Sequence, residues 1–333
     1  MSIGLTFLGT SSGVPTRRRN VSGLAVHTGP GAQWLLVDCG EGTQHQLLRT
    51  RLNLRDLQGV FITHSHGDHI LGLPGLLASA GMQGRQTPLA LVAPRAVLDW
   101  LHAVPDLFLP YPLHATAWDE PGAGAPLWQG GEAAHTVQVR PHALVHRVPS
   151  VAFEISVQRH SHRLDGERLR ALGLPPGPLW GALQAGDDVT WQGSLIASAD
   201  VLRHTTQTQT LVVGGDNAEP QRLREVCARA QLLVHEATYT RAVLDKVGPQ
   251  YLHSCAADVA RMAAQAGLPN LVLTHFSPRF DNQADGLEPL RTEAAAHYPG
   301  HLVLAEDLAR YTLHDDGRLV HEPNTLEKND DRD

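Results

Sequence analysis

The chain has 333 residues, of which 42% are hydrophobic and 18% charged, and its net charge at pH 7 is −7. This composition is typical of a globular protein with one large or two smaller domains. The negative net charge gives no indication of a nucleic-acid partner. Three widely spaced cysteines exclude a disulfide scaffold and favour a reducing compartment. Without a signal-peptide pattern or a run of 18 apolar residues, we expect a soluble, cytoplasmic protein with no membrane span.

Short apolar runs recur along the chain, each followed by a polar or glycine-rich turn. In the first half they predict strands at residues 5–8, 24–27, 34–37, 59–63, 89–93, 136–140 and 151–157, and helices at 44–50, 70–80 and 95–104. In the second half, strands at 211–214, 232–234 and 271–273 alternate with helices at 220–230, 256–266 and 288–297. Such alternation indicates an α/β protein.

One segment, residues 158–188, does not fit this pattern. It is polar at first and then proline-rich, reading LPPGPLWG at 174–181. Because prolines lack the N–H that continues a sheet or helix, we expect a projecting arm inserted into a domain that spans residues 1–321. The charged tail, residues 322–333, is expected to be disordered.

The most informative segment lies at residues 59–69. An apolar run ends at Ile62, and His64, His66, Asp68 and His69 follow within a few residues. The carboxyl ends of strands are where α/β sheets place their ligands, and imidazole nitrogens and carboxylate oxygens bind zinc at about 2 Å. Four such groups exceed what one catalytic zinc takes from a protein, which favours two metals. The alternative is a histidine-rich surface loop.

Three outlying residues complete this set. His146 precedes the strand at 151–157, and Asp216 and His275 each follow a predicted strand. Each has an ordinary alternative, because a loop histidine can bond to the backbone and Asp216 can cap the helix at 220–230. With the 64–69 cluster they make seven ligands, enough for two zinc ions about 3.5–4 Å apart that share Asp216.

A second group combines the pair His235-Glu236 with His253. A carboxylate that orients an imidazole and raises its basicity makes a proton donor. The alternative is a buried ion pair that supports the site.

These residues carry a resemblance to a known family. HSHGDH at 64–69, His146, Asp216 and His275 match in order the ligand motifs of the metallo-β-lactamase superfamily, and within it the chain resembles the ribonuclease Z family. The motifs that carry the second resemblance are FLGTSSGVPT at 7–16, PTRRRN at 15–20, VDCGEGTQ at 37–44, HEAT at 235–238, HSC at 253–255 and LPPGPLWG at 174–181.

The resemblance implies a four-layer αββα sandwich with a protruding, flexible arm. It implies that two zinc ions per subunit are held, one by His64, His66 and His146 and the other by Asp68, His69 and His275, with Asp216 between them. It further implies that Asp68 orients or deprotonates the attacking water and that His253, positioned by Glu236, protonates the leaving oxygen. Substrate contacts would come from Arg17, Arg19 and Asn20 and from the arm residues Gly177 and Pro178.

The implied activity is that of a zinc-dependent hydrolase, an endoribonuclease that removes the 3′ trailer of precursor tRNA. A hydroxide shared by the two zinc ions would attack the phosphodiester and leave a tRNA 3′ hydroxyl and a 5′-phosphorylated trailer. The enzyme would be a homodimer in which the arm of one subunit serves the other. Arg17, Cys255 and Ala182 stand where the family usually has Lys, Thr and Lys, which concerns tRNA contacts more than the reaction.

Two other functions compete with this one. The zinc motifs alone also fit a hydrolase of the same fold that acts on small phosphodiesters or sulfate esters. A non-catalytic RNA-binding dimer is the second alternative, and the complete ligand set argues against it.

Overall fold

The computed structural model describes residues 2–29, 31–104, 106–119, 126–132 and 134–323. The chain separates into two compact units. The first, which we call the body, comprises Met1–Gly130, Val137–Ser156 and Gln209–Asp333; the second, the arm unit, comprises Gly131–Thr136 and Val157–Thr208. The predicted insertion at 158–188 falls inside the arm unit, and the expected domain limits stay a prediction. Most of the tail predicted to be disordered, residues 324–333, lies outside the described part.

Two large sheets contain most of the strands. The first has, in spatial order, β17 (Leu319–Glu322), β16 (Arg310–Leu313), β1 (Ile3–Gly9), β2 (Gly23–His27), β3 (Trp34–Val37), β4 (Leu57–Phe61), β5 (Leu89–Ala93) and β6 (Leu113–Ala117). The second has β15 (His301–Leu304), β14 (Asn270–Thr274), β13 (Leu232–Glu236), β12 (Leu202–Gly214), β9 (Ser150–Leu164), β8 (His135–Leu144) and β7 (Trp128–Glu132). The strands predicted from the sequence all occur, most within two residues of their expected limits in the body.

Parallel pairing decides where the polar strand ends meet. In the first sheet β3, β4, β5 and β6 run parallel, and in the second β12, β13, β14 and β15 do so. The carboxyl ends of each parallel set therefore share one edge, where α/β proteins place their ligands.

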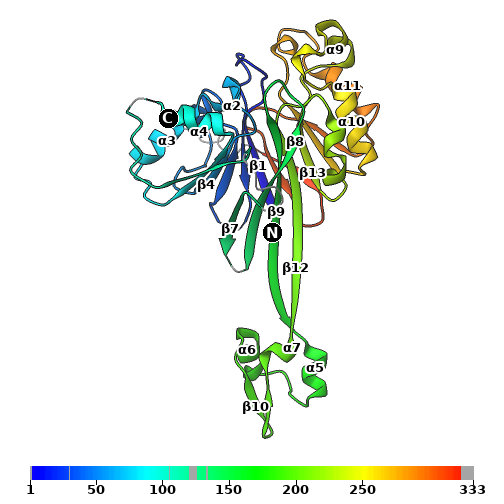
Figure 1. Ribbon diagram of the computed structural model, residues 1–333. Coiled ribbons are helices and arrows are strands. Elements are labelled where there is room, and N and C mark those ends of the chain that lie inside the picture. Colours follow the sequence, from blue (N-terminus) through cyan, green and yellow to red (C-terminus); the bar gives the residue numbers. More distant parts are fainter. Residues whose placement is uncertain (1, 30, 105, 120–125, 133, 324–333) are drawn as a thin grey trace, which may run out of the picture. The chain divides into compact units, whose positions relative to one another are not determined.

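Helices cover the outer faces of both sheets in the body, with α3 and α4 on the first and α10 and α11 on the second (Figure 1). The helices of the body are α1 (Thr43–Leu47), α2 (Gly67–Ile70), α3 (Leu73–Met82), α4 (Arg95–His102), α8 (Arg224–Cys227), α9 (Arg241–Val247), α10 (Ala256–Gln265) and α11 (Glu288–Ala295). This confirms the four-layer αββα arrangement. The sequence did not predict α9, and it predicted one helix at 70–80 where the structure has a break between α2 and α3.

The residue at the break, Gly72, lies in a close backbone contact. A Cβ at this position would lie 2.1 Å from the Gly40 carbonyl oxygen, so only glycine lets the two backbones approach this closely. The contact holds the end of α2 against the turn that follows β3, and α2 carries two of the predicted metal ligands.

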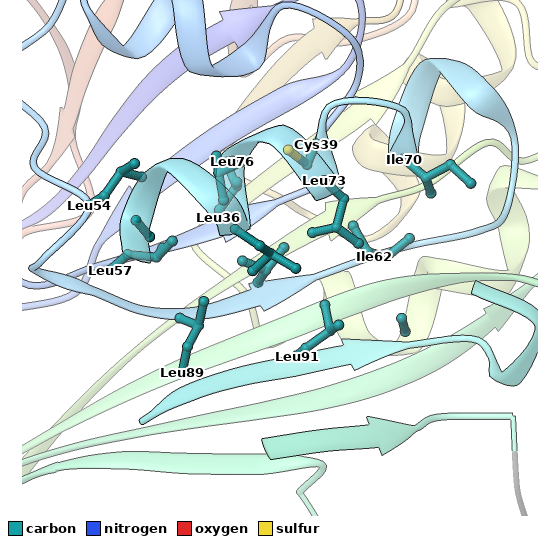
Figure 2. Packing of buried hydrophobic residues seen from close by; sticks show 14 of the residues in the cluster. Leu36, Cys39, Leu54, Leu57, Ile62, Ile70, Leu73, Leu76, Leu89 and Leu91 are labelled. Carbon is teal, nitrogen blue, oxygen red and sulfur yellow. The ribbon is translucent and has the colours of Figure 1, made fainter. Parts of the chain in front are cut away.

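Each outer helical layer packs on its sheet through a hydrophobic core. In the first core, Leu73 and Leu76 of α3 pack over Leu36, Leu57 and neighbouring strand residues (Figure 2). In the second, residues of α8, α10 and α11 pack on β13 and β14. Burial of these apolar surfaces is the main favourable term for the sandwich, and it leaves the polar strand ends at one edge.

The arm unit has elements and a core of its own. Its helices and short strands are α5 (Gly166–Ala171), α6 (Pro178–Ala185), β10 (Val189–Trp191), β11 (Ser194–Ile196) and α7 (Ser198–Val201). Leu169, Leu174 and Leu183 are buried in a separate hydrophobic cluster. The prolines do not exclude a helix, because Pro178 begins α6 and proline is tolerated at the first helical position. No helix in the described part of the chain is long and apolar enough to cross a membrane.

Candidate metal centre

The predicted ligands come from loops that follow strands and from one short helix. β4 ends at Phe61, His64 and His66 lie in the turn after it, and Asp68 and His69 lie in α2. His146 follows β8, Asp216 follows β12 and His275 follows β14. The structure brings all seven together at the shared strand edge in the body.

His64, His66, His146 and Asp216 form one group, whose ligand atoms all lie within 4.8 Å of one another. His66 Nδ1 lies 3.2 Å from His64 Nε2 and 3.1 Å from His146 Nε2. Three imidazole nitrogens thus point at one spot.

Asp68, His69 and His275 form a second group. His275 Nε2 lies 3.3 Å from His69 Nε2 and 3.3 Å from Asp68 Oδ2, and the His69 Nε2 to Asp68 Oδ2 distance is 3.5 Å.

Asp216 stands between the two groups and offers one carboxylate oxygen to each. Its Oδ1 lies 3.5 Å from His69 Nε2 and 3.3 Å from His275 Nε2. Its Oδ2 lies 3.5 Å from His64 Nε2 and 3.6 Å from His146 Nε2. This is the arrangement that a bridging carboxylate requires.

The donor set fits two zinc ions. Zinc binds imidazole nitrogen and carboxylate oxygen at 2.0–2.2 Å in a tetrahedron, so two donors on one ion lie about 3.3–3.5 Å apart. The distances within both groups, 3.1–3.6 Å, match that separation.

Second contacts fix the orientation of four of the five histidine rings. The outward nitrogen of His69 lies 2.7 Å from Asp38 Oδ2. Thr238 Oγ1 lies 3.1 Å from His275 Nδ1, Thr63 Oγ1 lies 3.0 Å from His64 Nδ1, and His146 Nδ1 donates to the Leu252 carbonyl at 2.8 Å. Partners of this kind set the tautomer and raise ligand basicity. We did not predict any of these four roles from the sequence, although Asp38, directly after a predicted strand, gave the same signal as the ligands.

The electrostatics of the pocket favour bound cations. Burial lowers the pKa of His64 well below its ordinary value, which favours the neutral imidazole that binds metal. Burial opposes ionisation of Asp68, but His69 and His275 outweigh it and hold the pKa of that carboxyl well below its usual range. Burial likewise lowers the pKa of His69, and the carboxylates of Asp68, Asp38 and Asp216 reverse the effect and raise it.

Glu236 holds His253 beside this cluster. His253 Nδ1 lies 3.0 Å from Glu236 Oε1 and 3.7 Å from Asp216 Oδ2. Burial lowers the pKa of His253, but Glu236, with Asp216 and Asp68, overcomes this and raises it to about 9. A ring that stays protonated at neutral pH is suited to donate a proton. His235 has a different role, because its Nδ1 donates to the Glu236 carbonyl at 2.7 Å, away from the cluster.

Asn217 connects the segments that carry His146, His235 and Glu236, and its role was not predicted from the sequence. Its Oδ1 accepts from the amides of Val145 and Glu219, and its Nδ2 donates to His235 Nε2. Its own amide donates to Glu236 Oε1. The fully buried Asn217 therefore joins the loop of His146 to the strand of Glu236.

The predicted substrate residues are distributed differently. Arg17 is exposed in the loop after β1, whereas the Arg19 guanidinium has partners within the body: its Nε lies 3.2 Å from Asp281 Oδ1, and it lies over the Phe276 ring. The Asn20 backbone amide donates to Asp307 Oδ2 at 2.6 Å. Gly177 and Pro178 are exposed in the arm unit.

Comparison with known proteins agrees with this geometry. A family model described as "Anti-Pycsar protein Apyc1" matches residues 3–104, less than half of the chain but including the HSHGDH segment. Among solved structures, the metallo-β-lactamase fold protein YhfI from Bacillus subtilis is 19% identical with a TM-score of 0.63, covering 94% of this chain and 100% of that one. The short form of human tRNase Z is 24% identical with a TM-score of 0.59, covering 92% and 98%. Both similarities establish the metallo-β-lactamase fold.

Closer relatives establish the family. The ribonuclease Z of Pseudomonas putida (strain F1) is 49% identical over 321 residues, which cover 95% of this chain and 98% of that protein. The ribonuclease Z of Marinobacter nauticus is 46% identical, with coverage of 94% and 97%. With the strand-edge cluster of His and Asp residues in place, the chain belongs to the ribonuclease Z family.

Proposed function

We propose that this protein is a hydrolase, an endoribonuclease that removes the 3′ trailer of precursor tRNA and leaves a tRNA 3′ hydroxyl and a 5′-phosphorylated trailer. One observation carries the proposal: seven ligand residues converge in two groups that share Asp216, in a chain 49% identical to a ribonuclease Z over almost its whole length.

We further propose that the divalent metals are two zinc ions, one at His64, His66 and His146 and one at Asp68, His69 and His275, joined by Asp216. Bound there, zinc would lower the pKa of a water and neutralise charge on the phosphate oxygens. The donors, five imidazoles and two carboxylates, match the preference of zinc for nitrogen and oxygen ligands.

The protein's own groups then act on either side of the phosphorus. Asp68 would orient the attacking water and accept its proton. As the bond between phosphorus and the 3′ oxygen breaks, His253 protonates that oxygen from Nε2, since Nδ1 is held by Glu236. Water supplies the OH that stays on the trailer phosphate and the proton that ends on the tRNA 3′ oxygen.

The arm unit would select the substrate by shape. A-form RNA is recognised mainly through phosphates and 2′ hydroxyls, so an arm that grips the folded tRNA body needs no sequence readout. The exposed Gly177 and Pro178, with the nearby Arg168 and Arg170, support this role.

We also propose the homodimer and the cytoplasmic location expected from the sequence. Large apolar side chains support a partner surface on the body: Leu48 after α1 is 77% exposed, Met82 at the end of α3 is 88% exposed, and Phe108 after α4 is 81% exposed. Where exposed apolar side chains form one contiguous patch, they mark protein–protein interfaces. Sedimentation of the purified protein tests the dimer.

The central experiment compares one defined precursor tRNA with a chromogenic phosphodiester. The purified protein, reconstituted with Zn²⁺ or Mn²⁺, is incubated with each, and the released ends are mapped. We expect cleavage of the precursor at the trailer junction with far higher efficiency than hydrolysis of the small ester. Equal efficiency on both, or no tRNA cleavage, would favour the small-ester hydrolase; binding without any cleavage would favour the RNA-binding dimer.

The variant Asp216→Ala tests the metal centre. Because Asp216 gives one oxygen to each ligand group, its loss should remove metal and both activities together. Metal content measured by mass spectrometry is the direct readout, and full metal content in this variant would contradict the bridging role.

The role of the arm unit is tested by deleting it between the paired strands β9 and β12. Ser161 Oγ and Thr205 Oγ1 lie 2.7 Å apart across β9 and β12, so residues 162–204 can be replaced by an Asn-Gly turn. We expect loss of tRNA cleavage with small-ester hydrolysis unchanged. An equal fall in both activities would mean that the arm unit supports the fold instead.

A further inference from the structure

A hollow of about 250 Å³ lies between the loop after β1 and helix α1. Arg17 and Arg18 line it from the loop, and His45 and Arg49 line it from α1 and the turn that follows. All four side chains are on exposed residues. We call these four residues the Arg49 pocket.

The base of this pocket is built from a carboxylate whose oxygens are already engaged. Asp307 Oδ2 accepts from the Asn20 amide at 2.6 Å and from Gln46 Nε2 at 2.8 Å, and Oδ1 accepts from Thr10 Oγ1 at 2.7 Å. Asp307 thereby fastens the loop to α1. Burial is the main cause that raises the pKa of this carboxyl.

Within the described part of the chain, the arginines that line the pocket form no direct ion pair, and the acidic group at its base, Asp307, interacts with Arg49 only through its electrostatic field. Among the described residues, no carboxylate lies within the 4.0 Å ion-pair limit of Arg17, Arg18 or Arg49. Arg19 differs, since Asp281 pairs with it. Three exposed guanidinium groups surround one hollow in a chain of net charge −7, and of these Arg49 also donates to Gln46 Oε1 at 3.1 Å. Guanidinium groups match phosphate oxygens in geometry and in charge.

The same loop reaches the metal centre. The Gly13 amide donates to Asp68 Oδ2 at 2.7 Å, so one end of the loop contacts a predicted metal ligand while the other lines the pocket. Gly13 has a φ of 74°, which favours glycine at this turn. The loop thus joins the metal centre to the pocket.

We propose that the Arg49 pocket binds a backbone phosphate of the RNA whose scissile phosphate lies at the metal centre, with Arg49 as a ligand that the loop alone does not supply. The inference rests on the proposed function, because it takes RNA as the substrate of the metal centre. The role of such a contact is to hold the chain in register across the site.

The test is Arg49→Gln in the full-length protein, with Arg51→Gln as matched control. Arg51 is the same residue type two positions away and lines a different hollow, with Leu52 and Gln83. Fluorescence anisotropy measures the binding of a labelled precursor tRNA as NaCl is varied. For Arg49→Gln we expect affinity to fall about tenfold and the slope of log affinity against log salt to shrink by about 1, the loss of one phosphate contact.

Activity provides the second readout. KM for the precursor should rise in Arg49→Gln, and likewise in Arg18→Gln on the other wall, while hydrolysis of the chromogenic phosphodiester stays at the wild-type rate. Precursors with trailers of one and ten nucleotides locate the phosphate: a defect seen only with the long trailer places it in the trailer, and a defect seen with both places it in the acceptor end.

Affinity, salt slope and KM that match those of Arg51→Gln would overturn the proposal. If the wild-type protein cleaves no precursor tRNA, the proposed function fails, and the anisotropy measurement still decides whether Arg49 binds an RNA phosphate. Failure of the proposed function and failure of the Arg49 proposal can therefore be distinguished.

Discussion

Replacement of Asp38 by Asn should weaken one metal site selectively. Asp38 is 5% exposed, and its two oxygens share the Thr63 hydroxyl but differ in their other partners. Oδ1 accepts from the Thr63 amide at 2.8 Å, and Oδ2 faces His69 Nδ1 at 2.7 Å. In the Asp38→Asn variant the remaining side-chain oxygen must stay opposite the Thr63 amide, so the new NH₂ group faces His69. The left-handed backbone at this position, with a φ of 60°, is tolerated by asparagine.

The consequence follows from the tautomer of His69. Two donors cannot face each other, so His69 Nδ1 loses its proton and becomes the acceptor, and the proton moves to Nε2. A protonated Nε2 cannot bind a metal. Loss of such an orienting carboxylate typically costs 10–100-fold in metal affinity, which is about 1.4–2.7 kcal/mol. The site at Asp68, His69 and His275 should weaken by this amount.

The assay is a competition titration in which a zinc chelator indicator reports both affinities. We expect the first zinc to bind nearly as in the wild type and the second to bind 10–100-fold more weakly. Asp99→Asn on the exposed face of α4 removes the same charge far along the sequence from any ligand and serves as the control. Two unchanged affinities, within about threefold, would refute the reasoning.

Three further predictions concern other parts of the molecule. Leu169 is buried in the core of the arm unit, so Leu169→Ala should destabilise that unit by about 2–5 kcal/mol. The variant should have a higher KM for precursor tRNA and unchanged small-ester hydrolysis, and an unchanged KM would contradict the prediction. Asn217→Ala should remove the partner of the buried His235 Nε2, at roughly 1–3 kcal/mol, and of the part-buried amides of Val145 and Glu219. Denaturant unfolding should show lower stability, and zinc titration should show weaker binding. Glu154, beside Arg229 and His142, has a pKa that is lowered despite burial. Its ionised form therefore stabilises the fold fully at pH values above its ordinary pKa near 4.5. The stability difference between wild type and Glu154→Gln should shrink as pH falls below 4.5 and be lost once pH passes the lowered pKa.

The sequence alone was sufficient to find the seven predicted ligands, and their role in binding metal stays a prediction until metal is measured. Four of them lie within residues 64–69, so their proximity is a property of the local chain. Asp216 and His275 each follow an apolar run that becomes a strand, and a polar residue at a strand end has only one edge of the sheet to occupy. His146 was placed only by the strand that it precedes, at 151–157. Residue type and strand periodicity are both local, which is why the sequence carries them.

Side-chain partners far along the chain were decided by the tertiary structure. Arg17, Arg18 and Arg19 look alike in the sequence, yet only Arg19 meets Asp281, more than 250 residues away. Asp38, Thr238 and the Leu252 carbonyl orient histidines for the same reason: the packing of two sheets places them there. Such contacts depend on which backbones approach each other, and no local pattern of residues records that.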